Sequence, residues 1–237
     1  MTEAAPATSF VVPAYNEEKC LPGTLAAIHA AARELGIAYE IVVADDASTD
    51  ATAELARAAG ARVVAVQHRQ IARTRNSGAG AARGERLIFV DADTRVNARL
   101  VAAALAALEA GAVGGGATPV FEGEAPRWAH RMMAVVVTTM RWMNLAAGCF
   151  LYCRRDAFEG VGGFDERHFA GEEVMLSWAL RGRGRFVMLR EEVHTSPRKF
   201  TSRSLGETLG LSARLLASGL RGARRRESTQ FWYDGRR

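Results

Sequence analysis

The sequence predicts a single α/β domain with a doubly wound, mostly parallel sheet and helices on both faces. Short runs rich in Val and Ile alternate with Ala-rich segments of helical periodicity, and no Pro/Gly/Ser-rich linker long enough to separate two domains interrupts the chain. The 237 residues also suffice for one large core. We expect a flexible N-terminus over 1–7, a folded domain over 8–200 with halves 8–95 and 96–200, and a basic C-terminal helix and tail over 201–237.

The N-terminal half shows the clearest alternation of periods. β-branched runs predict strands at residues 9–13, 40–44, 62–66 and 86–90, and apolar residues at helical spacing predict helices at 21–35, 52–59 and 71–82. Because the strands are nearly continuous in apolar residues, they indicate a parallel sheet that is buried on both faces. Such an arrangement is typical of nucleotide-binding α/β layers.

The C-terminal half is less regular. We expect helices at 97–110 and 172–181, and strands at 113–121, 148–153 and 185–189. The most membrane-like stretch, residues 132–153, carries Arg141 near its middle, so we interpret it as a buried or interfacial element. Beyond residue 204, leucines at helical spacing beside arginines predict an amphipathic basic helix.

The composition is that of an ordinary globular protein, with 49% hydrophobic and 24% charged residues. It excludes disordered, collagen-like and coiled-coil classes. The net charge of +5 favours anionic partners such as phosphates, nucleic acid or a lipid surface, without choosing among them. Three irregularly spaced cysteines fit neither a disulfide framework nor a zinc site, and the first residues lack a signal-peptide pattern. A cytoplasmic setting is therefore expected.

Three of the predicted strands end in polar clusters. The clusters are Pro-Ala-Tyr-Asn-Glu-Glu at 13–18, Asp-Asp-Ala-Ser-Thr-Asp at 45–50 and Asp-Ala-Asp-Thr at 91–94. Ligands of an open parallel sheet collect beyond the carboxyl ends of its strands. One such loop is equally well explained by turn formation and helix capping. Three acid-bearing loops at one edge instead indicate a bound cation.

Asp91 and Asp93 are the strongest candidates for holding that cation. They follow an apolar strand directly, which places both carboxylates at the rim of a rigid element. One or two carboxylates, together with phosphate oxygens and water, suit Mg²⁺ or Mn²⁺. The alternative is an N-cap for the helix at 97–110, a role that Thr94 or Asn97 would serve equally well.

Taken together, these motifs resemble the inverting family 2 glycosyltransferases of the GT-A fold. The resemblance rests on Pro13-x-Tyr-Asn-Glu17, Asp45-Asp-x-Ser-x-Asp50, Arg75-Asn-x-Gly78, Ala82-x-Gly84 and Phe89-Val-Asp-Ala-Asp93, and downstream on Gly162-Gly-Phe-Asp165 and Gly171-Glu-Glu173 followed by Leu176. It extends over about residues 8–200. Each motif is weak alone, but the combination is specific.

The resemblance implies how the nucleoside of a donor would be bound. Pro13, Tyr15 and Glu17 would line the nucleoside pocket, and Asp46 would accept a hydrogen bond from the base. Arg75 would approach the base or the diphosphate. Because Asp46 and Arg75 match uridine-contacting positions of the family, a UDP-sugar is the favoured donor, with GDP- and dTDP-sugars as alternatives.

The resemblance also implies a metal and diphosphate site. Asp93 would bind the Mg²⁺ or Mn²⁺ ion, and Asp91 would contact the ribose or the metal's water shell. His194 is a candidate for a further metal ligand, since neutral imidazole suits Mn²⁺; the alternative is a loop histidine that only forms hydrogen bonds. Arg198 and Lys199 would clamp the diphosphate, or else carry solvated loop charge.

Catalysis by inversion needs a carboxylate that takes the proton of the acceptor hydroxyl. By position Glu173 matches this base, and Glu172 would support it or orient the acceptor. Relatives usually have Glu-Asp here and often a further acid where this chain has Met175. The longer arm of Glu173 moves the reactive oxygen by about an ångström. The alternative is a pair of first-turn acids that the helix dipole favours.

We therefore expect a metal-dependent, inverting transfer of sugar from a nucleotide-sugar to the hydroxyl of an envelope, lipid-linked or small-molecule acceptor. A sugar-1-phosphate nucleotidyltransferase is one alternative, although residues 13–16 lack its Gly-rich, basic loop. A non-catalytic protein that binds membranes through the Arg-rich tail is another. The C-terminal helix either contacts the inner membrane face peripherally or packs on the domain with a solvated basic face. A nucleic-acid partner is not expected.

Overall fold

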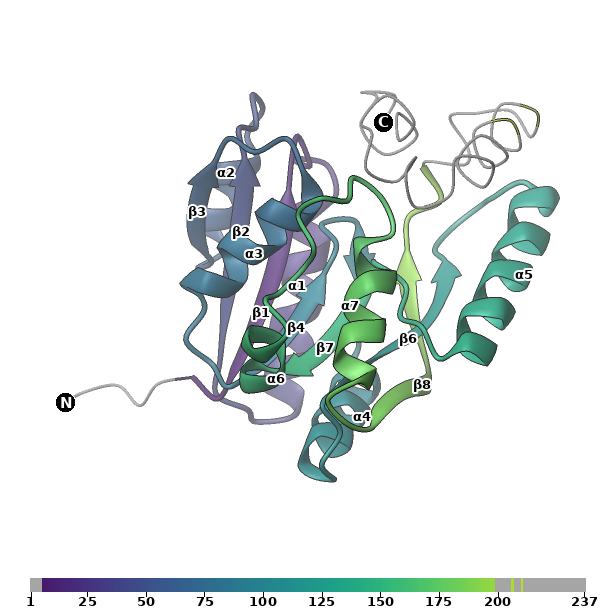
Figure 1. Ribbon diagram of the computed structural model, residues 1–237. Coiled ribbons are helices and arrows are strands. Elements are labelled where there is room, and N and C mark those ends of the chain that lie inside the picture. The colour runs from purple at the N-terminus through teal and green to yellow at the C-terminus, as the bar shows by residue number, and fades with distance from the viewer. Residues whose placement is uncertain (1–5, 199–205, 207–209, 211–237) are drawn as a thin grey trace.

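The computed structural model describes residues 6–198 together with Gly206 and Gly210. Lys199 and nearly all of the expected C-terminal basic helix lie outside these described residues. In the described part of the chain, eight strands form one sheet in the order β3-β2-β1-β4-β7-β6-β8-β5, with helices on both of its faces (Figure 1). The predicted α/β class with a mostly parallel sheet is confirmed.

The elements follow the predicted alternation closely in the first hundred residues. The strands are β1 (Thr8–Ala14), β2 (Tyr39–Asp46), β3 (Arg62–Val66), β4 (Arg86–Val90), β5 (Thr94–Arg95), β6 (Gly114–Phe121), β7 (Phe150–Arg154) and β8 (Phe186–Thr195). The helices are α1 (Leu21–Glu34), α2 (Thr52–Ala58), α3 (Ile71–Ala81), α4 (Ala98–Glu109), α5 (Arg127–Met143), α6 (Arg155–Gly160) and α7 (Glu172–Arg181).

Strand direction explains where a ligand can bind. β1 pairs in parallel with β2 and β4, and β2 pairs in parallel with β3. The carboxyl ends of these strands, and the polar loops that follow them, therefore lie at one edge of the sheet. β7 then runs antiparallel between β4 and β6, and the short β5 pairs antiparallel with β8.

Two apolar layers hold the helices against the sheet. Alternate side chains of the central strands, such as Phe10 and Val12, pack with α1 and α4, whereas Val11 and Phe89 pack with α3, α6 and α7. Gly78 lets α3 approach β1 closely, because a Cβ at this position would lie 2.6 Å from Cγ1 of Val11. This close packing fixes α3 beside the strand ends that carry the polar clusters.

The structure departs from the prediction at several elements. β8 continues to Thr195 instead of ending near residue 189, and neither the two-residue β5 nor the helix α6 was predicted. Of the two interpretations of the Met- and Trp-rich segment, buried or interfacial, α5 does not fit the buried one, because only Ala129 of this helix is buried. The reason is that α5 packs on β6 at the side of the molecule (Figure 1). In the described part of the chain, no helix is long and apolar enough to cross a bilayer.

Candidate active site

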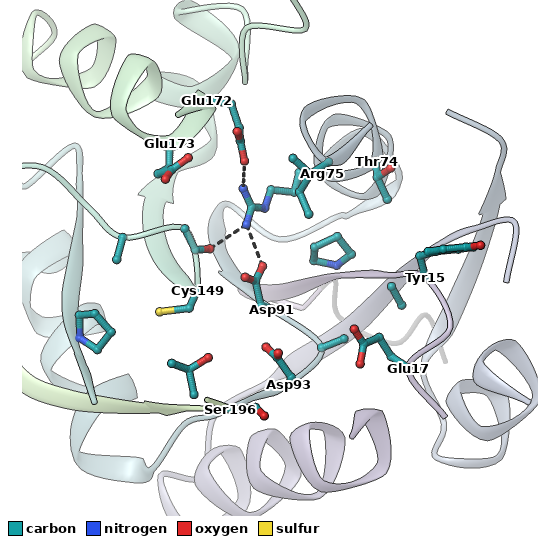
Figure 2. A pocket seen from close by; sticks show the side chains of 18 of the residues that line it. Tyr15, Glu17, Thr74, Arg75, Asp91, Asp93, Cys149, Glu172, Glu173 and Ser196 are labelled. Atoms are coloured by element: carbon teal, nitrogen blue, oxygen red, sulfur yellow. Dashed lines mark hydrogen bonds and ion pairs between the residues drawn. The ribbon is translucent and has the colours of Figure 1, made fainter. Parts of the chain in front are cut away.

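A cavity of about 570 Å³ lies beyond the carboxyl ends of β1, β2 and β4. Its wall brings together side chains from all three polar clusters and from the start of α7 (Figure 2). The predicted site residues in this wall are Pro13, Tyr15, Glu17, Asp46, Arg75, Asp91, Asp93, Glu172 and Glu173. The edge of the sheet therefore gathers the donor-side and the acceptor-side candidates in one space.

The loops after β1 and β2 are tied to each other by hydrogen bonds. The backbone N–H of Asn16 donates to Oγ of Ser48 at 2.9 Å, and the N–H of Thr49 donates to Oδ1 of Asn16 at 2.8 Å. The N–H of Glu17 donates to Oγ1 of Thr52 at 2.8 Å. These bonds hold the turn in which Asn16 takes a positive φ of 52°. Tyr15 and Glu17 are thereby fixed at the cavity wall.

The carboxylate of Asp46 organises the loop between β3 and α3. It accepts hydrogen bonds from the backbone N–H groups of His68, Arg69 and Gln70 at 2.6, 2.9 and 3.2 Å, and from the hydroxyl of Thr74 at 2.9 Å. These four bonds fill the acceptor positions of both oxygens. Asp46 thus has a structural task that the sequence did not indicate, and the predicted contact with a base stays a prediction.

This loop places Arg69 against Tyr15 in the cavity. The guanidinium carbon of Arg69 lies 3.9 Å from the centre of the Tyr15 ring, and the Arg69 backbone has a positive φ of 50°. Both residues line the cavity. Stacked aromatic and guanidinium planes are surfaces that nucleobases bind. Arg69 was missed by the sequence analysis, because a lone Arg in a loop carries no motif.

Arg75 is a buried cation at the centre of the site (Figure 2). Its Nη1 donates to Oε1 of Glu172 at 2.7 Å, and its Nη2 donates to Oδ1 of Asp91 at 2.7 Å and to the carbonyl of Gly148 at 2.8 Å. Burial disfavours the charge, but Asp91, Glu172 and Glu173 outweigh burial and raise the pKa of Arg75. The guanidinium therefore stays charged and couples carboxylates from β4 and α7.

Asp93 faces a different cation. Nη2 of Arg198 lies 3.2 Å from Oδ2 of Asp93 and 2.7 Å from Oε2 of Glu17. The charges of Glu17 and Asp93 outweigh the desolvation of Arg198 and raise its pKa. Two acidic groups thus converge on a point where positive charge is stabilised, which is the electrostatic condition for a cation site. The predicted contact of Arg198 with a diphosphate stays a prediction.

Asp91 and Asp93 fit a divalent ion whose other ligands are phosphate oxygens and water. In the described residues, no group of three His, Cys, Asp or Glu side chains converges to hold a metal unaided. Mg²⁺ in phosphate sites needs only one or two carboxylates, since phosphate and water supply the remaining ligands. Asp93, with Asp91 two residues before it, meets that requirement. The site is suited to a metal that arrives with its nucleotide.

The structure does not bring His194 into the cavity wall. His194 pairs with Arg95 and Val120 in the sheet, whereas its neighbours Thr195 and Ser196 line the cavity. In the described residues, His194 also forms no cluster with two other His, Cys, Asp or Glu side chains that could hold a metal. The geometry gives no support to His194 as a metal ligand. Lys199, the other late candidate, lies outside the described residues.

Glu172 and Glu173 occupy the first turn of α7. Glu172 is buried against Arg75, whereas Glu173 faces the cavity beside Gly148, where a Cβ would lie 3.6 Å from the Glu173 carboxyl carbon. Removal from water and the charge of Glu172 raise the pKa of Glu173 to about 8, although Arg75 opposes this shift. A carboxylate tuned near neutral pH is suited to proton transfer.

A side-chain clasp positions α7 relative to α3. Nδ2 of Asn76 donates to the carbonyl of Phe164, and the N–H of Phe164 donates to Oδ1 of Asn76, both at 2.9 Å. Gly163, with a φ of +74°, lies so close that a Cβ would be 2.7 Å from Oδ1 of Asn76. Two motifs that are distant in sequence therefore form one structural unit. It supports the loop that leads into Gly171 and α7.

The apolar side of the cavity is formed in part by the Met- and Trp-rich segment, which the sequence leaves open between a core element and a contact with a hydrophobic acceptor or lipid. Its wall there consists of Pro119, Phe121, Met133, Val136 and Met140 from β6 and α5. From periodicity alone, such residues would be assigned to a hydrophobic core. Only the position of α5 in the structure shows that Met133, Val136 and Met140 line the cavity. The site thus has a charged end, at Arg75 and the acids, and an apolar end.

Comparison with known proteins agrees with this geometry. Residues 9–164 match the family model described as glycosyl transferase family 2. The chain belongs to this family. Membership in this family indicates that the protein is a glycosyltransferase. It gives no support to the two alternatives, a sugar-1-phosphate nucleotidyltransferase and a non-catalytic membrane-binding protein.

Curated relatives of this glycosyltransferase match over part of their length. An undecaprenyl-phosphate 4-deoxy-4-formamido-L-arabinose transferase of Pseudomonas paraeruginosa is 45% identical over 96 residues, which cover 36% of this chain and 27% of the relative. The transferase of the same name from Aeromonas hydrophila is 38% identical over 96 residues, covering 36% of this chain and 28% of the relative. The match therefore spans little more than a quarter of these proteins.

Solved structures share the GT-A fold with this glycosyltransferase. Mannosyltransferase PcManGT from Pyrobaculum calidifontis, in complex with GDP-Man and Mn²⁺, has a TM-score of 0.67 at 19% identity, covering 93% of this chain and 63% of its own. Glucosyl-3-phosphoglycerate synthase from Mycobacterium tuberculosis, in complex with Mn²⁺, UDP and glucosyl-3-phosphoglycerate, has a TM-score of 0.64 at 18% identity, covering 92% and 79%. S. aureus TarS 1-349 with UDP-GlcNAc has a TM-score of 0.61 at 20% identity, covering 97% and 72%.

Proposed function

We propose that this glycosyltransferase is a metal-dependent, inverting enzyme that takes its sugar from a nucleoside-diphosphate sugar, with a UDP-sugar favoured. The observation that carries the proposal is that Asp91, Asp93 and Glu173 line one cavity, in which Arg75 joins Asp91 to Glu172, the chain neighbour of Glu173. An acidic rim for a metal and diphosphate thus lies near a carboxylate suited to accept a proton. Direct transfer needs both groups within reach of one sugar.

On the donor side, Tyr15 and Arg69 offer a surface for the base, and the rim acids face the diphosphate end. Solved structures of the same fold contain UDP, UDP-GlcNAc or GDP-Man, two of them with Mn²⁺. Asp93, with Asp91 beside it, would hold the divalent ion, which neutralises charge on the leaving diphosphate when bound. Arg198 would move from Glu17 and Asp93 to the diphosphate as the site fills.

On the acceptor side, Glu173 acts as general base. The acceptor hydroxyl oxygen attacks the anomeric carbon, the bond from that carbon to the diphosphate oxygen breaks, and the nucleoside diphosphate leaves with the bonding pair. Glu173 takes the hydroxyl proton, so every charge is accounted for. Attack on the face opposite the leaving group inverts the anomeric centre. Glu172, fixed by Arg75, keeps the first turn of α7 in place.

The acceptor belongs, in this proposal, to the lipid-linked class. The curated relatives are named undecaprenyl-phosphate 4-deoxy-4-formamido-L-arabinose transferases, which supports a lipid-linked acceptor. The general-base step above applies to an acceptor that attacks through a hydroxyl, because an ionised phosphate oxygen carries no proton for Glu173 to take. A cytoplasmic enzyme at the inner face of the membrane would meet both a nucleotide-sugar and such an acceptor. The basic C-terminal segment remains a predicted membrane contact.

Binding of UDP, measured by calorimetry with and without Mn²⁺, tests the donor site. We expect Mn²⁺ to strengthen UDP binding to the wild-type protein, and Asp93→Ala to remove that gain. Asp156→Ala is the matched control, since Asp156 lies far from the cavity wall in an exposed pair with Arg154. Unchanged metal dependence in Asp93→Ala would overturn the metal assignment. A panel of nucleotide-sugars scored by nucleoside-diphosphate release would then identify the donor.

A further inference from the structure

The outer side of α5 exposes large apolar side chains. In the described part of the chain, five such side chains are exposed, and four belong to α5: Val135, Val136, Trp142 and Met143. The fifth is Trp178 of α7. Trp142 is 87% exposed and Val135 66% exposed. Apolar surface of this kind, gathered on one helix, indicates an interaction site.

The polar groups of this helix do not break the apolar surface. The hydroxyls of Thr138 and Thr139 donate to the carbonyls of Ala134 and Val135 at 2.7 and 2.9 Å, so the hydrogen of each hydroxyl is already bonded within the helix. Arg141 donates to Oγ1 of Thr118 and to the carbonyl of Leu189, at 2.6 and 2.9 Å. Residues 132–140 carry no charge. The surface of α5 therefore remains apolar between its ends.

The charges of α5 have one sign. The helix contains three arginines and one histidine but no acidic residue. Arg127 and Arg131 are exposed at its N-terminal end, next to the apolar segment. An apolar helix face with a tryptophan and with flanking arginines matches the interface of an anionic bilayer, where rings lie among headgroups and arginines meet phosphates.

The same helix also forms a wall of the cavity. Met133, Val136 and Met140 line it, and Val136 is in addition 45% exposed to solvent. An apolar chain that leaves a lipid surface along α5 would therefore meet the apolar end of the cavity. Its polar head would then face the charged end around Arg75 and Glu173.

We propose that α5 docks on the surface of an anionic lipid bilayer and leads a membrane-lipid acceptor into the cavity past Val136. The helix has 17 residues, fewer than a bilayer span requires, so it lies in the interface and does not cross. The membrane contact of α5 is inferred only from the exposure of its apolar side chains and from its arginines. The delivery of a lipid acceptor to the cavity rests in addition on the proposed function.

Co-sedimentation of the full chain with vesicles tests the docking surface. The wild-type protein is expected to bind vesicles of phosphatidylglycerol and phosphatidylethanolamine, and to bind pure phosphatidylcholine more weakly. Val135→Asp and Trp142→Ala are each expected to weaken binding to the anionic vesicles by roughly tenfold, because each removes an apolar side chain from the lipid contact. Trp178→Ala removes the exposed tryptophan of α7 and is expected to bind as the wild type does.

Three results would overturn the docking surface. One is equal binding by wild type, Val135→Asp and Trp142→Ala. The second is binding that survives both substitutions but disappears when residues 211–237 are removed, which would assign the contact to the tail. The third is a dimer without vesicles that Val135→Asp converts to a monomer, which would make α5 a contact between two copies.

The result of the vesicle-binding test does not depend on whether the donor site is assigned correctly. Val135 and Trp142 do not line the cavity, so both variants should bind UDP with Mn²⁺ as the wild type does. Lost vesicle binding with intact UDP binding supports the α5 surface. Vesicle binding without metal-enhanced UDP binding would instead refute the proposed function and leave the docking surface standing.

Discussion

Arg75 binds Glu172 across 97 residues of sequence, through a hydrogen bond of 2.7 Å. Its second arm holds Asp91 at the same distance. One guanidinium thus connects the strand end that carries the acidic rim with the helix that carries the acceptor-side glutamates. The relative position of the two halves of the site depends on this buried charge.

Arg75→Met is expected to destabilise the protein strongly. The substitution leaves Glu172 and Asp91 without their cation, and a broken buried ion pair costs about 3–5 kcal/mol. Arg73→Met is the control on the same helix, because Arg73 and Glu166 form a pair in which both side chains are about half exposed. That pair is worth at most about 1 kcal/mol. Urea unfolding measures both, and equal losses would contradict the central role of Arg75.

The raised pKa of Glu173 predicts a pH dependence of activity. A general base works in its ionised form, so kcat/KM should rise with pH through about 8, the pKa of Glu173. Glu173→Gln should abolish transfer and leave UDP binding intact. Turnover retained in Glu173→Gln would show that the acceptor oxygen needs no base, as for a phosphate that is already ionised. Glu159→Gln, an exposed glutamate of α6 outside the cavity wall, is the control.

The same shift predicts a pH dependence of stability with the opposite trend. The folded protein favours protonated Glu173, whose pKa rises from 4.5 in the unfolded chain to about 8. Its contribution to stability is therefore complete below pH 4.5 and is lost as the pH rises through 8. Glu173→Gln, which cannot ionise, should flatten this part of the stability curve. Denaturant unfolding at pH 6 and pH 9 measures the free energy of unfolding of the wild type and of Glu173→Gln. An equal change between the two pH values in both proteins would contradict the raised pKa of Glu173.

Most of the fold could be predicted from the sequence, because buried parallel strands and helices each have a clear period. Asp91 and Asp93 were found for a related reason, because acids that directly follow an apolar strand need a partner or a function. Glu173 was found only through the resemblance to family 2 glycosyltransferases. α5 could not be placed in this way. Met133 and Val136 have the pattern of core residues, and only the packing of α5 on β6 decides that they line a cavity.

Single residues were harder to assign than motifs. The contact of Asp46 with a base stays a prediction, and the sequence did not reveal its structural partners. Three hydrogen bonds to its carboxylate come from the backbone of loop residues 68–70, and the fourth comes from Thr74 of α3. Arg75 was expected near the base or the diphosphate, whereas in the structure it binds Asp91 and Glu172. A pattern identifies which residue types are needed; their partners depend on contacts between distant segments.

Asp46→Asn distinguishes a structural role of Asp46, in holding the loop at residues 68–70, from the predicted contact with the donor's base. If its carboxylate mainly holds the loop at residues 68–70, the amide, with only one acceptor oxygen, should loosen the stack of Arg69 on Tyr15. The KM for every nucleotide-sugar should then rise by a similar factor, while kcat changes less. Arg69→Ala, which removes the stack but keeps the loop bonds, should have the same effect. A change in the preference among UDP-, GDP- and dTDP-sugars would instead show that Asp46 contacts the base directly.

The clasp between Asn76 and Phe164 predicts that Gly163→Ala is more destabilising than Gly162→Ala. Both glycines have positive φ values, of 74° and 81°, so alanine at either position costs about 1–2 kcal/mol of backbone strain. A Cβ at Gly162 meets no atom within 4 Å, whereas one at Gly163 would lie 2.7 Å from Oδ1 of Asn76 and displace the clasp. Breaking its partly buried bonds should add about 1–3 kcal/mol. Urea unfolding of the two variants isolates the clasp from the strain, and equal destabilisation would mean that Asn76 adjusts without loss.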